Sequence, residues 1–159
     1  MKFLVRADLD QLVERPLVLW ARNPAAIELT LDKAEIVWPD RSPDWFEDRA
    51  WIWLHYGATK LQRGELFEAM GMIAFFREQV LGPMLNRRQR RPQRGVRNIE
   101  QIGREIDKLR GVVADHSKGA VTFALQNAVH LYLELRDDEL PSVLTPGMPE
   151  LLMPFLQPD

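Results

Sequence analysis

Three side chains that suit ligand binding lie on one line of an expected helix, inside the stretch "WFEDRAWIWLHYGATKLQRGELFEAM" from Trp45 to Met70. Glu47, Trp51 and His55 are spaced four residues apart, so a helix places them on the same face. A carboxylate, an aromatic ring and an imidazole suit a polar, ring-shaped ligand that stacks on the ring and forms hydrogen bonds at its sides. The same residues also suit the half-buried boundary of a bundle, so a substrate-binding and a packing interpretation both remain open.

A dense group of arginines follows in the segment "RRQRRPQRGVR", residues 87–97. It contains no acidic residue and six arginines: Arg87, Arg88, Arg90, Arg91, Arg94 and Arg97. Guanidinium groups at this density suit phosphate groups or an acidic partner. The helix dipole also favours cations after a helix C-terminus, which makes a solvated loop the competing interpretation. Nucleic acid is not expected as a partner, because the segment has no aromatic residue and the chain carries a formal net charge of -2.

The sequence lacks the short motifs of the common catalytic and metal sites. It contains no cysteine, which excludes disulfides, thiolate metal sites and cysteine catalysis. Its three histidines show no metal-binding spacing, so we expect no metal site from this chain alone. There is no nucleophile elbow, phosphate-cradling loop or dinucleotide fingerprint. No apolar run approaches the roughly 20 residues that cross a bilayer, and no signal peptide is recognisable, so we expect a cytoplasmic protein without a membrane partner.

The elements that must position these residues are mostly helical. Caps, stop signals and apolar spacing predict four helices, over residues 43–63, 65–86, 98–113 and 117–137. A kink is expected near Gly82 and Pro83, and Asn98 is the expected cap of the third helix. Short connections favour an up-and-down bundle of about four helices, followed by a Pro-rich tail. The predicted fold class is therefore mainly α.

A small strand–helix–strand part is expected ahead of the bundle. The apolar runs at 2–7 and 17–21 predict strands, and Asp8 can cap a short helix between them that Pro16 ends. A further short helix is expected directly after Asn23, and two prolines mark residues 38–43 as a linker. Two strands alone leave backbone groups unpaired, so this part of the chain requires neighbours.

The order of these pieces resembles the C-terminal region of bacterial nucleotidyltransferase-like proteins, which are relatives of the aminoglycoside nucleotidyltransferases in the polymerase-beta-like superfamily. The resemblance covers most of residues 2–135 and rests on "KFLVRADLDQLVERPLVLWAR", on residues 45–83 and on "RPQRGVRNIE". Its most specific part is "HYGATK" followed by "RGELFEA". It implies that residues 1–37 are the remnant of a mixed-sheet catalytic domain and that residues 38–159 are a helical, substrate-binding-like bundle.

The resemblance also implies what this chain does not carry. In that family a Gly-Ser turn precedes two acidic residues, and a third acid on a later strand completes a site for magnesium and a nucleoside triphosphate. The sequence has no such turn, and Asp8 and Asp10 fall after the strand that would carry the third acid. We therefore expect magnesium and a nucleoside triphosphate only where a catalytic partner supplies their site.

Three residues of the bundle are candidates through the resemblance. In aminoglycoside-modifying relatives a carboxylate of the helical domain can accept the proton of the substrate hydroxyl, and Glu47 is the candidate base here. Lys60 and Glu65 belong to the recognisable block and are candidates for ordering a substrate or phosphate. A simple ion pair at a helix end is the competing interpretation for that pair.

The function expected from the sequence is a substrate-binding-like helical domain that works with a separate catalytic nucleotidyltransferase chain, or a non-catalytic remnant of one. The alternatives are a complete small-molecule nucleotidyltransferase with an aminoglycoside-like substrate, and a dimeric helical scaffold without a ligand. The expected partners are a second copy of the chain or the catalytic chain, together with a small polar ligand.

Overall fold

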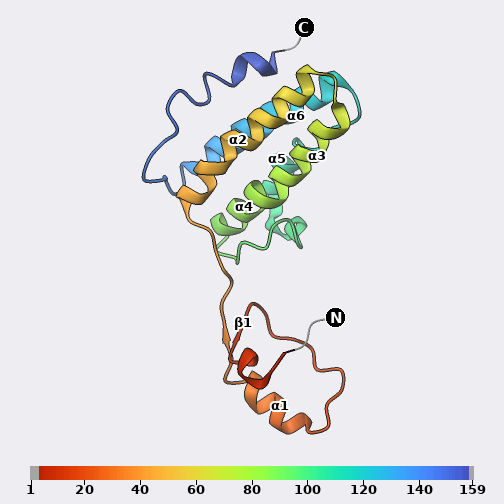
Figure 1. Cartoon of the computed structure of the whole chain (residues 1–159), viewed down its shortest axis with the longest axis vertical. Coiled ribbons are helices and arrows are strands. Elements are labelled where there is room, and N and C mark those ends of the chain that lie inside the picture. Colours follow the sequence, from red (N-terminus) through yellow and green to blue (C-terminus); the bar gives the residue numbers. More distant parts are fainter. Residues whose placement is uncertain (1–3, 158–159) are drawn as a thin grey trace. The chain divides into compact units, whose positions relative to one another are not determined.

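The computed structural model describes residues 4–157 and divides the chain into two units, with the division between Asp40 and Arg41. Helices dominate, and the two described strands are two residues long each. The fold class predicted from the sequence, a mainly α protein with a small strand-bearing N-terminal part, is confirmed (Figure 1).

The second unit is a bundle of helices around one apolar core (Figure 1). Its helices are α2 (Pro43–Gln62), α3 (Leu66–Phe76), α4 (Gly82–Arg88), α5 (Ile106–Arg110) and α6 (Lys118–Arg136). Helix α2 contacts both α3 and α6, and α3 also contacts α6. The largest side chains that these helices bury completely include Phe46, Phe76 and Tyr132.

Helix α2 begins and ends at the residues that the sequence predicts. The Ser42 hydroxyl accepts a hydrogen bond from the backbone N–H of Trp45 at 3.2 Å, and Pro43 occupies the first helical position. Gly64 follows the C-cap with a φ of 73°, a left-handed conformation that stops the helix without the cost of a side chain. Local signals at both ends therefore place the twenty residues that carry Glu47, Trp51 and His55.

The second predicted helix is interrupted by a π-helical turn, Arg77–Leu81, which joins α3 to α4. The kink was expected near Gly82 and Pro83, and the turn lies just before them. Pro83 has no N–H to donate to the carbonyl of Gln79, four residues earlier. A side chain of another segment uses that carbonyl instead, since Arg41 donates to it from Nη1 at 2.8 Å.

The predicted third helix over residues 98–113 is wrong in its geometry. Asn98 adopts a left-handed conformation, φ 56°, and its side chain forms no cap hydrogen bond. A 3-10 stretch, Ile99–Glu105, follows and is broken at Gly103, φ 72° and ψ -140°, before the short α5 begins. The apolar spacing nevertheless buries Ile99 and Leu109, because 3-10 and α-helical turns bring similar positions onto one face.

The last long helix and the C-terminal tail, residues 137–157, close the bundle. Ser117, the first residue of the predicted helix, is the cap of α6 and accepts from the backbone N–H of Ala120 at 3.2 Å. The tail ends in a 3-10 turn, Met153–Leu156, that contacts both α2 and α6. Leu152 and Leu156 of the tail are fully buried, so the tail contributes to the core.

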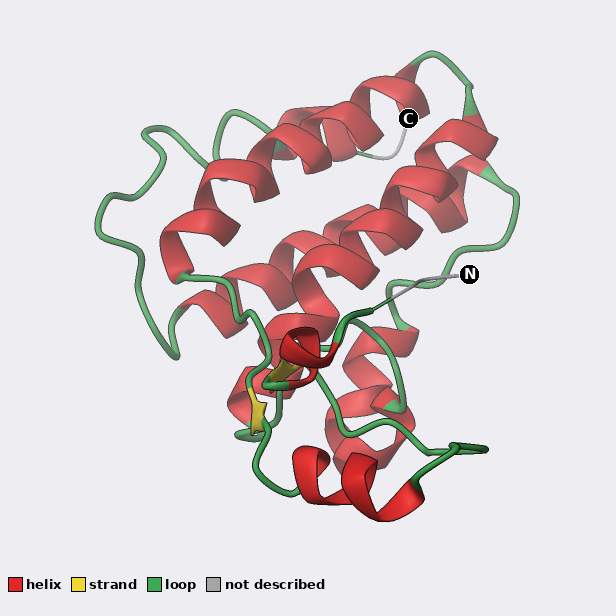
Figure 2. Ribbon diagram, turned by 60° about the horizontal axis from the view of Figure 1, so that its bottom comes forward, coloured by secondary structure: helices red, strands yellow, loops and turns green. Residues whose placement is uncertain are grey.

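The N-terminal unit contains little regular structure (Figure 2). Its elements are a 3-10 turn at Arg6–Leu9, β1 (Gln11–Leu12), α1 (Pro24–Leu31) and β2 (Glu35–Ile36). The two strands are parallel, with Gln11 opposite Glu35 and Leu12 opposite Ile36. Helix α1 lies between them in the chain, and Asn23 caps it as expected by accepting from Ala26 at 3.2 Å.

The predicted strand–helix–strand order of this unit is confirmed, but the residues assigned to the two strands are wrong. Residues 17–21 belong to no strand, and neither do residues 4–7; residues 2 and 3 lie outside the described part. The short helix expected from Asp8 to Pro16 is replaced by the 3-10 turn and β1. An apolar run becomes a strand only where a neighbour bonds its backbone, and within the described residues β1 pairs only with β2.

Candidate functional site

The carboxylate of Glu47 is buried at the start of α2, with 3% of the residue exposed. Its Oε1 accepts hydrogen bonds from the indole N–H of Trp51 and the backbone N–H of Thr145, both at 2.8 Å. Its Oε2 accepts from the hydroxyl of Tyr132, and Nη1 of Arg136 lies 3.5 Å away. One carboxylate therefore joins α2, α6 and the C-terminal tail.

These contacts set the protonation of the Glu47 and Tyr132 pair. Burial raises the pKa of the Glu47 carboxyl, but hydrogen bonds from Tyr132, Thr145 and Trp51 outweigh burial and hold the pKa below its usual 4.5. Burial, followed by the bond to Glu47, raises the pKa of the Tyr132 hydroxyl. A general base must lie within hydrogen-bond reach of the substrate proton. Because both Glu47 oxygens already accept bonds inside the core, their position does not suit the proton-accepting role that the resemblance implied.

Trp51 and His55 share a helix line with Glu47 but do not share its surroundings. Trp51 is 3% exposed and packs edge-on against the ring of Tyr132, with centroids 5.3 Å apart. His55 is exposed, and its ring lies 5.8 Å from that of Phe155 in the tail. The structure therefore brings Glu47 and Trp51 together in the core and leaves His55 on the surface.

Lys60 and Glu65 meet at the corner between α2 and α3. The Nζ of Lys60 lies 2.5 Å from Oε2 of Glu65, and it also lies 5.3 Å from the ring centre of Tyr56. The Tyr56 hydroxyl donates to Glu68 at 3.1 Å. These groups form a partly exposed polar corner, which matches the helix-end ion pair that the sequence left open for Lys60 and Glu65.

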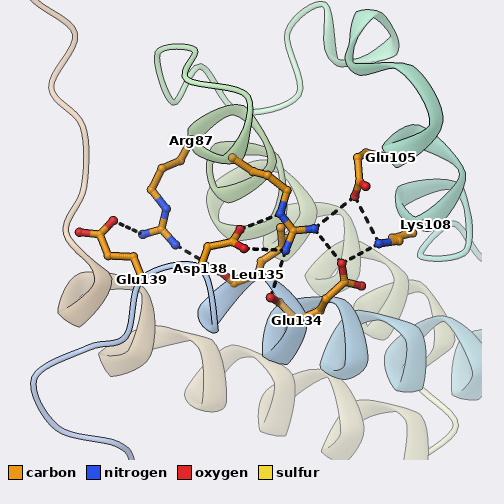
Figure 3. Close-up of polar contacts among 8 residues, drawn as sticks. Arg87, Glu105, Lys108, Glu134, Leu135, Asp138 and Glu139 are labelled. Atoms are coloured by element: carbon orange, nitrogen blue, oxygen red, sulfur yellow. Dashed lines mark hydrogen bonds and ion pairs between the residues drawn. The ribbon is translucent and has the colours of Figure 1, made fainter.

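Two of the six arginines, Arg87 and Arg88, lie in the last turn of α4 and pair with acids elsewhere in the bundle (Figure 3). Arg88 donates to Asp138 through Nε at 2.7 Å and through Nη2 at 3.1 Å. Its Nη1 lies 2.7 Å from Glu134 and 3.3 Å from Glu105. Hydrogen bonds to Asp138 are the main cause that raises the pKa of the Arg88 guanidinium.

The same network continues on both sides of Arg88. Arg87 lies 3.1 Å from Glu139 and donates to the carbonyl of Leu135 at 3.2 Å, while Lys108 lies 2.6 Å from Glu134 (Figure 3). Ion pairs thereby connect side chains of α4, α5 and the end of α6. Arg87 and Arg88 are thus engaged in the fold, and their positions do not suit an open phosphate site.

The remaining arginines belong to the loop after α4. Arg90 is exposed and has a left-handed φ of 54°, and Nη2 of Arg91 donates to the carbonyl of Asn98 at 3.4 Å. Arg94 and Arg97 also interact with other residues. Of the six arginines of the sequence, Arg87 and Arg88 are therefore paired with acids of the fold, and Arg90 is exposed in the loop.

The N-terminal unit presents an apolar surface. Among residues 4–40 only Thr30 and Leu31 are buried. Nine large apolar side chains of the unit are at least 40% exposed: Leu4, Val5, Val13, Leu17, Leu19, Trp20, Leu29, Ile36 and Val37. Leu17, Leu19 and Trp20 are the most open, at 84%, 87% and 78%. A unit that exposes so much apolar surface is typical of a segment that packs against another chain.

The helical unit contains a hollow of about 390 Å³ beside the π-helical turn. Its walls are mostly apolar and come from the loop before α5, from α5 and from the turn that follows α5. Arg77 lines it, and so do Arg110 and Glu100. Sequence analysis missed this site, because a π-helical turn has no local sequence signal and Arg77 belongs to no recognisable motif.

Two further findings concern metal sites and membrane-spanning helices. Within residues 4–157 no group of three or more His, Asp or Glu side chains is placed to hold a metal ion. Among the same residues, no helix is long and apolar enough to cross a membrane.

Comparison with known proteins gives no match to a protein family, a curated protein or a solved structure. The resemblance to nucleotidyltransferase-like proteins therefore stays a prediction from the residues of this chain.

Proposed function

We propose that this chain is the helical, substrate-binding-like part of a nucleotidyltransferase-type system, and that its N-terminal unit docks on a separate catalytic chain. The observation that carries the proposal is the burial of only two side chains among residues 4–40. A unit of this size without a core does not gain enough from its own contacts to offset the entropy of ordering its backbone.

The sheet of this unit supports the same conclusion. Strands β1 and β2 are parallel and form a two-stranded sheet, so the outer edge of each strand lacks a strand partner within the described residues. Parallel sheets occur almost only where other elements cover both faces. A mixed sheet of a catalytic chain would supply both the missing hydrogen bonds and the apolar cover.

The helical unit supports the role of a binding part. It has its own core, which runs through α2, α3, α4 and α6, and it exposes polar corners such as the one around Lys60 and Glu65. A small polar ligand would bind at such an exposed corner and would not reach Glu47. In this proposal the catalytic chain supplies the site for magnesium and the nucleoside triphosphate, and this chain supplies the surface that receives the acceptor substrate.

The experiment is co-expression with a catalytic nucleotidyltransferase chain that carries the Gly-Ser turn and its acidic pair, followed by light scattering behind a sizing column. We expect a complex of one copy of each chain. Replacing the three most exposed apolar residues, Leu17, Leu19 and Trp20, by Ser should abolish the complex, because their apolar area is buried only in the interface.

A matched control replaces Phe67, Val143 and Leu151 by Ser. These residues are 80%, 75% and 63% exposed and belong to the helical unit, so the complex should survive their change. A mass of 18.5 kDa at every concentration, with no complex, would overturn the proposal. A dimer of this chain alone that the catalytic chain does not displace would instead favour the dimeric scaffold.

A further inference from the structure

We propose that the hollow beside the π-helical turn binds a small carboxylate with an apolar body. The hollow is a concave site of about 390 Å³, within the range of small-molecule pockets. Ile99, Ile106 and Leu109 contribute apolar wall, and Ile99 and Leu109 are each only 3% exposed. This inference concerns the helical unit alone and does not depend on the proposed docking of the N-terminal unit.

The guanidinium of Arg77 is the polar group that selects the ligand. It is partly buried, and it forms no ion pair with any residue that the structure describes. Among the described residues its one hydrogen bond runs from Nη1 to the carbonyl of Val112 at 3.4 Å, which is long for a charged donor. A partly buried cation without a carboxylate partner is costly, and an anionic ligand would offset that cost.

The π-helical turn explains why Arg77 stands apart from its neighbours. Glu78 accepts from the backbone N–H of Val96 at 3.2 Å, and Gln79 accepts from Arg41 at 2.8 Å. Each polar neighbour of Arg77 in the turn therefore has a partner within the fold. Arg77 instead lines the large hollow and also a smaller one of about 130 Å³, which lies against α3. π-Helical turns inside α-helices occur frequently at functional sites.

The charge of the hollow favours a monoanion. Its charged lining groups are two arginines and one glutamate, a net formal charge of +1. Arg110 already pairs with Asp107 at 2.7 Å, so its charge is largely compensated at the rim. Glu100 on the same rim disfavours a dianion such as a phosphate group. A carboxylate can accept two parallel hydrogen bonds from the Arg77 guanidinium while its apolar body covers the wall.

A second hollow of similar size does not support a comparable proposal. It measures about 340 Å³ and lies between α5 and α6. Its charged groups include Lys108 and Glu134, which pair with each other at 2.6 Å. Of these two hollows in the described residues, the one at Arg77 has a charged lining group that forms no ion pair.

The test is a titration of the isotope-labelled full chain with octanoate, followed by amide chemical shifts. We expect saturable shifts at residues 96–113 and none from octylammonium at the same concentration. Inorganic phosphate, as the second anion, should bind more weakly than octanoate. Changing Arg77→Met should weaken octanoate binding at least about tenfold, because it removes a charged hydrogen-bond donor and keeps the apolar stem. Changing Arg63→Met, in an exposed side chain at the end of α2, is the matched control and should leave binding unchanged.

A second variant keeps the test decisive if the change at Arg77 disturbs folding. Val113 is 63% exposed and lines the hollow, so Val113→Glu should weaken octanoate binding by repulsion without loss of packing. The same type of change at Ile52, which is 65% exposed on α2, should have no effect. Equal binding of octanoate and octylammonium, tighter binding of phosphate than of octanoate, or unchanged octanoate binding after the changes at Arg77 and Val113 would overturn the proposal.

Discussion

The side chain of Arg41 completes the hydrogen bonding of Gln79, in the middle of the π-helical turn. Nη1 donates to the Gln79 carbonyl at 2.8 Å, and Nη2 donates to the side-chain oxygen of the same residue at 2.8 Å. The guanidinium also lies over the ring of Trp45, 3.8 Å from its centre. These bonds connect the segment just before α2 to the π-helical turn, where Pro83 cannot donate a hydrogen bond to the Gln79 carbonyl.

We expect Arg41→Met to lower the free energy of unfolding by about 1–3 kcal/mol, because the Gln79 carbonyl loses a charged donor. Chemical denaturation followed by far-ultraviolet circular dichroism measures the change. The change Arg63→Met removes an exposed guanidinium whose closest acid is 3.9 Å away and should cost little. If both variants lost the same free energy of unfolding, the hydrogen bonds of Arg41 to Gln79 would not contribute to stability.

Glu47→Gln should destabilise the bundle at neutral pH by about 2–3 kcal/mol, because four donors, Arg136 among them, lose a charged acceptor. The pKa of the Glu47 carboxyl lies below 4.5 in the folded chain, so its ionised form contributes stability above about pH 4.5. That contribution is lost as the pH falls through the folded-state pKa. Thermal melts between pH 7 and pH 3 should therefore converge for the wild type and the variant.

The control for this pH series is Glu68→Gln, which changes an exposed carboxylate bonded only to the Tyr56 hydroxyl among the described contacts. Its melting curve should follow the wild type at each pH. If the gap between the wild type and Glu47→Gln stayed constant down to pH 3, the Glu47 carboxylate would not be the group that titrates.

Gly82→Ala should destabilise the protein by about 1–3 kcal/mol, because a Cβ there would lie 2.5 Å from the carbonyl oxygen of Gly95. The loop after α4 and the start of α4 approach each other backbone to backbone at this point. Gly71→Ala is the opposite case, since no atom lies within 4 Å of the added Cβ and the residue is inside α3. We expect that change to stabilise by about 0.5–1 kcal/mol, and calorimetry of both variants checks the sign.

Arg88→Met should lower stability far more than Arg90→Met, although both come from one arginine-rich segment. Arg88 is bonded to acids of three elements, whereas Arg90 is exposed in the loop. We expect a loss of about 1–3 kcal/mol for Arg88 and less than about 0.5 kcal/mol for Arg90. Urea denaturation at constant salt compares them, and similar losses would contradict the structural role of Arg88.

The sequence predicts the helices whose ends carry local signals. Asn23 and Ser42 cap the helices expected after them, and Ser117 caps the helix expected to begin at this residue, because a cap depends on residues within one turn. The prediction of one helix over residues 98–113 is wrong because it rested on apolar spacing. Gly103 breaks the helix through a backbone conformation that this spacing does not reveal.

The candidate site was less predictable, because its geometry depends on distant residues. Glu47 meets Tyr132 and Thr145, which lie 85 and 98 positions away, so the helix line alone could not show that its carboxylate is buried. The strands expected around residues 17–21 also needed a partner that no local pattern supplies. Arg77 carries no motif, and only the folded chain shows that it lacks an ion pair among the described residues.

The long separation between Glu47 and its partners also has a consequence for the order of folding. Helices α2 and α3 are neighbours in the chain and can pair early, because little loop entropy is lost. Thr145 and the buried Leu152 and Leu156 must return across most of the bundle to reach α2 and α6. The tail should therefore close last during refolding and open first during local fluctuations, with the Glu47 carboxylate briefly hydrated each time it opens.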